Sequence, residues 1–301
     1  MKKTTIAKVL AGIMVAATML SGCGAKEEKQ KIVIAYAPNE STDESADARA
    51  GLAEDLEAAL GVEVEEIQAS DYNAIVEALR TGKADAAYMG ALATAHASDR
   101  AGAIPVAMKA PDRDRTQAVY HSLLITSSSN EDINSIEDIK GKTIAFVDPD
   151  STSGNLVPSS EIITAFADEN LDMDKLHTNG SFFEAASYSG SHQAGLQAVV
   201  RGDVDVVPIS NQILASEIAN GNVKENDIKI IHESGTIPAE AMVLSADVDD
   251  ETKKLLIKFL VEYDNEAYFT DVIKKENARF IECSIADYET VIQLNKVLNE
   301  E

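Results

Sequence analysis

Short apolar runs and amphipathic helical stretches alternate along the chain from Lys31 onward, and this alternation restricts the fold more than any other feature. In the first half, the strand-like runs lie at 32–36, 62–67, 85–89 and 104–108. The stretches between them have the period of amphipathic helices, and Gly61 and Gly82 follow two of them where a helix commonly ends. Strands separated by helices of this kind predict parallel α/β sheets.

The same alternation begins again in the second half of the chain. Strand-like runs lie there at 118–127, 143–147, 181–188, 203–207, 228–231 and 241–244. Helical stretches lie at 156–170, 192–201, 212–220, 250–263 and 287–298. A chain of 301 residues exceeds the usual size of one domain. The repeated pattern therefore predicts two α/β lobes.

Residues 148–154, Asp-Pro-Asp-Ser-Thr-Ser-Gly, lie between a predicted strand and a predicted helix. Ser151, Thr152 and Ser153 place three hydroxyl groups where the first turn of a helix leaves backbone N–H groups unpaired. The helix dipole favours negative charge at this end, and Gly154 lets the backbone approach a ligand closely. The segment predicts an anion site. The alternative interpretation is that its hydroxyls only cap the helix.

Three further side chains lie at strand ends or helix starts, where α/β proteins commonly bind ligands. Tyr72 begins a predicted helix and Tyr88 ends a predicted strand, so each can direct its hydroxyl into a cleft. The alternative for each is a half-buried ring with its hydroxyl in water. His192 also begins a helix, whose dipole disfavours imidazolium, so we predict a neutral ring that donates one N–H. A purely structural histidine is the alternative.

The N-terminus has the organisation of an export signal. A basic Met1-Lys2-Lys3 start precedes an apolar run too short to span a membrane comfortably, and Leu20-Ser21-Gly22-Cys23 follows it. That tetrapeptide resembles a bacterial lipobox. It predicts a lipoprotein signal peptide over residues 1–23, lipidation of Cys23 and a tether over residues 24–30. We expect a protein held by its lipid on the extracytoplasmic face of the cell membrane; an ordinary exported protein cleaved nearby is the alternative.

The formal charge of −25 argues against binding to nucleic acid or to an anionic membrane surface. It also repels anions, so an anion site on this chain must work through close, directed donors. The two cysteines and five histidines have no zinc or iron–sulfur spacing. We therefore expect no metal and no other cofactor.

An enzyme that uses His192 with a serine is a competing hypothesis from a different functional class. The chain has no Gly-x-Ser-x-Gly motif, and no acidic residue is identifiable as the group that orients His192. Gly141-Lys142-Thr143 does not complete a P-loop, because Ile136 stands where the first glycine is required. We therefore predict no catalytic residues.

Together these segments resemble the periplasmic phosphonate- and phosphite-binding proteins, which capture ligands for ABC importers. The resemblance extends from Ile32 to the mid-260s, and its most specific element is the segment 148–154. It is also carried by the segments 71–76, 83–90, 135–146, 189–192, 202–206 and 234–238.

The resemblance implies a type II periplasmic-binding-protein fold, in which two α/β lobes joined by two hinge crossings clasp a small oxyanion. We expect residues 31–122 and 238–301 to form lobe 1 and residues 123–237 to form lobe 2. An ABC transporter permease is the implied partner, and the chain is expected to be a monomer. The implied ligand-binding residues are Tyr72, Tyr88, Ser151, Thr152, Ser153 and His192.

The ligand's substituent is the open point. Relatives that bind aminoalkylphosphonates place an acid near the turn after the 204–207 strand, whereas the turn 208–212 here, Pro-Ile-Ser-Asn-Gln, is neutral. Because an ammonium buried without a partner is costly, we expect phosphite, small alkylphosphonates or phosphate rather than 2-aminoethylphosphonate. Glu40, after the first strand, is an alternative source of negative charge. A sulfonate or another small acid is the alternative ligand.

Overall fold

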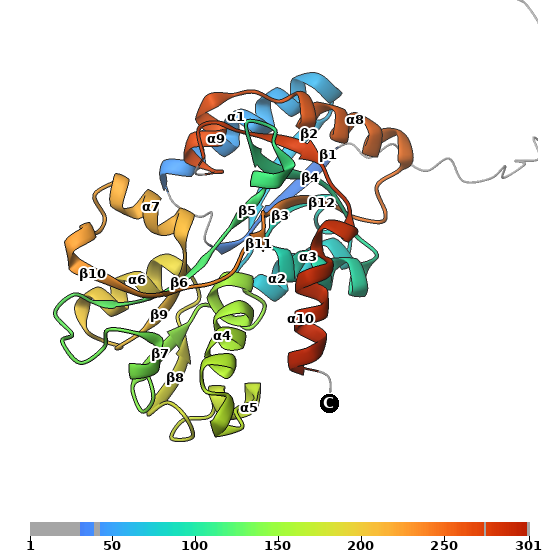
Figure 1. The fold of residues 1–301 in the computed structure, drawn as a ribbon. Coiled ribbons are helices and arrows are strands. Elements are labelled where there is room, and N and C mark those ends of the chain that lie inside the picture. Colours follow the sequence, from blue (N-terminus) through green and yellow to red (C-terminus); the bar gives the residue numbers. More distant parts are fainter. Residues whose placement is uncertain (1–30, 39–42, 274, 300–301) are drawn as a thin grey trace, which may run out of the picture.

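The computed structural model describes residues 31–38, 43–273 and 275–299, which form two α/β lobes (Figure 1). The predicted signal peptide, the lipobox with Cys23, the tether and Glu40 lie outside the described residues. The largest sheet has six strands in the order β13-β4-β12-β3-β1-β2. Their bounds are Lys31–Tyr36 for β1, Glu63–Gln68 for β2, Ala86–Met89 for β3, Ile104–Pro111 for β4, Ala241–Leu244 for β12 and Ala278–Glu282 for β13.

The prediction of parallel sheets is wrong for three of the five strand pairs in this sheet. Strand β1 pairs in parallel with β2 and β3. Strand β12 runs antiparallel to β3 and β4, and β13 runs antiparallel to β4. The reason is connectivity, because β12 follows the return of the chain from the other lobe and enters the sheet in the opposite direction.

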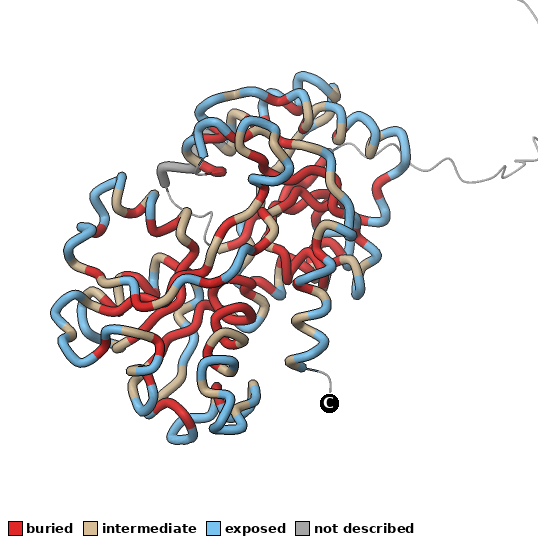
Figure 2. Tube along the Cα trace, in the orientation of Figure 1, coloured by how far each residue is buried: buried red, intermediate tan, exposed pale blue. Residues whose placement is uncertain are grey.

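Helices cover both faces of the six-stranded sheet. One face packs against α1 (Asp43–Leu60), α8 (Asp250–Glu262) and α9 (Glu266–Asp271). The other packs against α2 (Tyr72–Arg80), α3 (Ala91–Ala101) and α10 (Glu289–Asn299). Successive side chains of a strand alternate between the faces, so the sheet separates two apolar cores. Figure 2 shows the buried residues concentrated on the strands and the exposed ones on the outer helices.

Lobe 2 contains an antiparallel sheet in the order β10-β6-β9 and a parallel pair, β7 with β8. The strands are β6 (Ser122–Ser127), β7 (Thr143–Phe146), β8 (Ala185–Tyr188), β9 (Val207–Ser210) and β10 (Ile228–Glu233). Helices α4 (Val157–Ala165) and α5 (Met173–His177) pack on one core, and α6 (His192–Arg201) and α7 (Asn211–Ala219) pack on another. The predicted strand at 203–207 begins only at Val207, because Asp205 and Val206 bond to the edge of β7 instead.

Two chain crossings join the lobes. The continuous strand predicted at 118–127 is broken at His121 into β5 (Val119–Tyr120) and β6, and β5 pairs with β11 (Ile237–Pro238). Beside this pair, the Ser122 N–H donates to Ser234 Oγ at 2.9 Å. These contacts lie where the chain passes from one set of sheets to the other and back. We therefore propose residues 31–122 and 238–301 as lobe 1 and residues 123–237 as lobe 2.

Candidate ligand-binding site

A narrow cavity lies between the lobes, and all six side chains singled out in the sequence line it. The six are Tyr72, Tyr88, Ser151, Thr152, Ser153 and His192. The remaining lining residues are Ala37, Met89, Gly90, Tyr120, Ser210, Ile213 and Glu240. The cavity leaves about 20 Å³ for the centre of a water-sized sphere, which is room for one or two water molecules. In this closed arrangement it suits a ligand of a few heavy atoms.

The three predicted hydroxyl residues lie at a π-helical turn, Thr152–Leu156, which leads directly into α4. Ser151 is the N-cap of this turn, and its Oγ accepts the Gly154 N–H at 3.1 Å. A Cβ atom on Gly154 would lie 2.3 Å from the Cβ of Val147, so the turn closes only around a glycine. Ser151 therefore both caps the turn and lines the cavity, together with Thr152 and Ser153.

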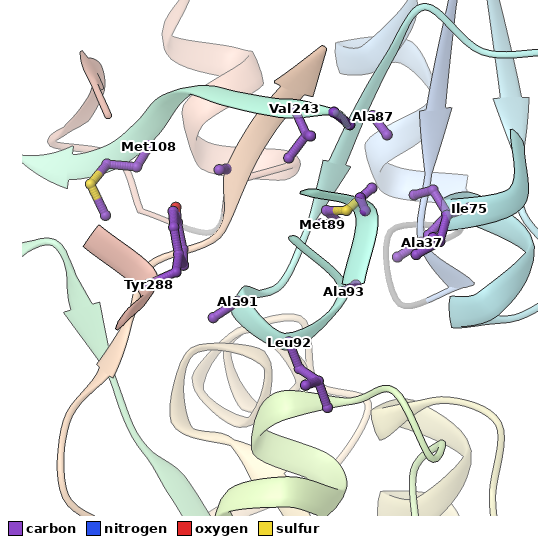
Figure 3. Packing of buried hydrophobic residues seen from close by; sticks show 14 of the residues in the cluster. Ala37, Ile75, Ala87, Met89, Ala91, Leu92, Ala93, Met108, Val243 and Tyr288 are labelled. Carbon is purple, nitrogen blue, oxygen red and sulfur yellow. The ribbon is translucent and has the colours of Figure 1, made fainter. Parts of the chain in front are cut away.

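The other two hydroxyls of the turn face groups outside it. The Leu92 N–H, in the first turn of α3, donates to Thr152 Oγ1 at 2.8 Å, and this bond joins the two lobes. Ser153 Oγ lies 3.3 Å from His192 Nε2. In Figure 3 the side chain of Leu92 extends from α3 toward α4, so apolar and polar contacts between the lobes lie side by side.

His192 is the first residue of α6, and its ring is buried against the turn before α7. Burial lowers the pKa of the imidazole to about 4, although a hydrogen bond with the Pro208 backbone opposes this. Burial therefore favours the neutral ring that the sequence predicts. A neutral imidazole has one donor and one acceptor nitrogen, which suits hydrogen bonding inside a dry site.

The two tyrosines enter the cavity from lobe 1. Tyr72 begins α2, whose N-cap Asp71 accepts the Ala74 N–H at 2.7 Å, and the Tyr72 backbone N–H bonds to Asp148 of the opposite lobe. Tyr88 is the second-last residue of β3, and its ring also packs edge-on against Phe280, with 6.5 Å between the centroids. Tyr88 therefore belongs both to the cavity wall and to the core of lobe 1.

Three carboxylates lie close to the hydroxyl turn, and each has a partner on the protein. Asp148 accepts the Asp150 N–H at 2.8 Å as well as the N–H of Tyr72. Asp150 lies 3.1 Å from His96 Nδ1 of α3, and this contact lowers the pKa of the carboxyl. The Glu240 carboxylate lies 2.6 Å from the Lys109 ammonium. Pairing limits the repulsion that these charges exert on an anion in the cavity.

Tyr120 and Glu240 are among the seven lining residues that were not predicted as ligand-binding from the sequence. Tyr120 reaches the cavity from the first crossing, and its hydroxyl contacts the side chains of Thr152 and Ser153; burial raises its pKa. Glu240 precedes β12. The only sequence signal for Glu240 was an acid placed next to an apolar strand, and the tyrosine had none.

Among the described residues that line the cavity, none is Lys or Arg. Within the described ranges, no group of three or more His, Cys, Asp and Glu side chains is arranged to hold a metal ion. No helix in that part of the chain combines the length and the apolar composition needed to cross a membrane. Any anion in the cavity would therefore meet hydroxyls and a neutral imidazole, beside the Glu240 carboxylate with which Lys109 pairs.

Two α/β lobes joined by two crossings, with helix starts directed at a cavity between them, define a solute-binding protein of the type II periplasmic class. A family described as the phosphonate, periplasmic substrate-binding protein of ABC transporters matches residues 34–288. The chain belongs to this family.

Individual relatives agree with that assignment. The phosphate-import protein PhnD of Mycolicibacterium smegmatis is 27% identical over 263 residues, which cover 82% of this chain and 80% of the relative. The phosphonates-binding periplasmic protein of Escherichia coli is 29% identical over 251 residues, covering 82% and 70%. The binding protein of a Pseudomonas aeruginosa ABC phosphonate transporter superposes with a TM-score of 0.77 at 25% identity, covering 90% and 87%.

These comparisons confirm the predicted fold class and the predicted function as the extracytoplasmic binding component of an ABC importer. They also decide between the two functional hypotheses, since the family consists of substrate-binding proteins and not of enzymes.

Proposed function

We propose that this protein captures a small phosphorus oxyanion, such as phosphite, methylphosphonate or phosphate, between its lobes and delivers it to an ABC permease. The observation that carries the proposal is the convergence of Ser151, Thr152, Ser153 and His192 on one narrow cavity with no Lys or Arg in its lining. Tyr72 and Tyr88 would complete the site from lobe 1. A relative from Prochlorococcus marinus with the same fold was solved in complex with methylphosphonate, which supports this ligand class.

Neutral donors are sufficient for an anion here. A hydrogen bond to a charged group contributes about 1.5–3 kcal/mol. Four or five such bonds would outweigh the field of the distant surface carboxylates, which is screened beyond ~8 Å at physiological salt. A small tetrahedral anion also matches the narrowness of the cavity.

We also propose that residues 1–23 direct export, that Cys23 carries a lipid anchor and that the protein acts as a monomer at the membrane surface. The support for the anchor is the lipobox-like sequence Leu20-Ser21-Gly22-Cys23. A receptor held near its permease by a short tether needs no transmembrane helix of its own.

Isothermal titration of the purified protein with phosphite, methylphosphonate, phosphate, 2-aminoethylphosphonate and methanesulfonate tests the ligand class. We expect one of the first three to bind most tightly and methanesulfonate to bind weakly. Ser153→Ala should raise the dissociation constant of the tightest-binding ligand at least tenfold, whereas the matched change Ser128→Ala on the exposed surface should leave it unchanged. Tighter binding of methanesulfonate, or no binding of any phosphorus oxyanion, would contradict the proposal.

A further inference from the structure

A buried ion pair at the edge of the cavity joins Glu240, which lines the cavity, to Lys109, which does not. Lys109, near the end of β4, is 5% exposed, and its Nζ lies 2.6 Å from the carboxylate of Glu240. The same ammonium donates to Gln212 Oε1 of α7 at 2.5 Å and lies 3.4 Å from the Ile273 carbonyl oxygen. Lys109 therefore links a cavity carboxylate in lobe 1 to a side chain of lobe 2.

Glu240 lies close enough to the anion site to affect a bound ligand. It lines the cavity, and its charge acts on the hydroxyl of Tyr120, which in turn contacts Thr152 and Ser153. A substituent extending from an oxyanion held by those two residues would approach Tyr120 and then Glu240.

A buried carboxylate in such a position is neutralised either by protonation or by a cation. A ligand can bring a cation to it, or the protein can supply one, because an unpaired buried charge costs several kcal/mol. Here the Lys109 ammonium already occupies that role, and Gln212 holds it in place. Gln212 belongs to the neutral turn 208–212, so a side chain of this turn binds the protein's own lysine.

We propose that Lys109 is a specificity-determining residue: its ammonium satisfies Glu240 from within the protein and so excludes ligands that carry a cationic substituent. Oxyanions with a small uncharged substituent are favoured as a result. This inference rests on the proposed function, because it concerns the substituent of a ligand bound at the hydroxyl turn. It explains the preference for uncharged over cationic substituents by the pairing of Glu240 with Lys109, in addition to the absence of an acid from the turn 208–212.

The test compares methylphosphonate with 2-aminoethylphosphonate by isothermal titration at pH 7. The wild-type protein should prefer methylphosphonate. In Lys109→Met the ratio of the two dissociation constants should shift at least tenfold toward 2-aminoethylphosphonate, because the ligand's ammonium can then pair with Glu240. In the matched double variant Lys109→Met/Glu240→Gln the carboxylate is also removed, and the ratio should return to within about threefold of the wild-type value, a spread typical of context effects.

A wild-type preference for 2-aminoethylphosphonate, or an unchanged ratio in folded Lys109→Met, would overturn the inference while leaving the proposed function in place. If wild type binds neither ligand, the proposed function fails, and the inference fails with it.

Circular dichroism establishes first whether Lys109→Met is folded, since removing one partner of a buried pair is destabilising. If it is unfolded, Glu240→Gln provides the reciprocal test. That variant leaves the Lys109 ammonium beside the cavity without its carboxylate. The carboxylate of phosphonoacetate can then pair with Lys109, so the affinity for phosphonoacetate should rise at least tenfold relative to the affinity for methylphosphonate. An unchanged ratio there would likewise overturn the inference.

Discussion

Replacing His192 with glutamine should remove a defined part of the acid sensitivity of folding. The imidazole has a pKa of about 4 in the folded protein, against 6.5 for an ordinary histidine, because it is buried. At pH 7.5 the ring is neutral in both states. As the pH falls below 6.5, the unfolded chain takes up a proton that the folded protein does not, so the free energy of unfolding decreases until the pH reaches about 4. The difference between the two pKa values corresponds to roughly 3 kcal/mol.

The assay is urea denaturation followed by circular dichroism between pH 7.5 and pH 4.5, in phosphate-free buffers so that the cavity stays empty. Between these limits the wild-type protein should lose about 2–3 kcal/mol more than His192→Gln. The carboxylates titrate in both proteins, so their contribution cancels in the difference. Ser128→Ala, on the exposed surface of lobe 2, is the control and should behave like wild type. Equal pH dependence of wild type and His192→Gln would refute the reasoning.

Three further outcomes are expected. Gly154→Ala should lower the free energy of unfolding by about 1–3 kcal/mol in urea denaturation, because its Cβ would lie 2.3 Å from that of Val147; a variant as stable as wild type would contradict the geometry. Thr152→Val leaves the Leu92 N–H without its acceptor in the closed protein and should weaken ligand binding roughly tenfold, whereas Thr152→Ser should retain wild-type affinity in the same titration. Cys23→Ser should move the protein from the membrane fraction to the soluble fraction on cell fractionation, and unchanged membrane association would argue against the lipid anchor.

That the six proposed site residues line one cavity was predictable because local patterns locate the ends of secondary structure. Tyr72 and His192 begin helices after capping residues, Tyr88 lies one residue before the end of a strand, and Ser151 caps the turn before α4. In α/β folds such positions gather at one edge of a sheet, so their placement along the chain was enough to predict that they meet. The proposed boundary between the lobes falls within the apolar run predicted as one strand at 118–127, which the structure divides between two sheets.

The rest depends on contacts that no local pattern records. Lys109 and Glu240 are far apart in sequence and meet because β12 lies beside β4 in the six-stranded sheet. Strand β13 and helix α9 were not predicted as elements at all. Strands β12 and β13 each run antiparallel to β4, and β12 also to β3. These directions depend on the route of the chain. The sequence does not reveal them, because hydrophobic periodicity is the same for parallel and antiparallel strands.

The π-helical turn at Thr152–Leu156 has a consequence for how this chain can vary. A turn of this type holds one residue more than an α-helical turn. Deleting one residue there would leave an ordinary helix whose apolar positions still pack, but it would rotate the hydroxyl-bearing positions about the helix axis, away from α3 and α6. Side-chain exchanges within the segment are therefore easier to accommodate than a change in its length, and descendants of this sequence that still take up the same nutrient should differ here by substitution alone.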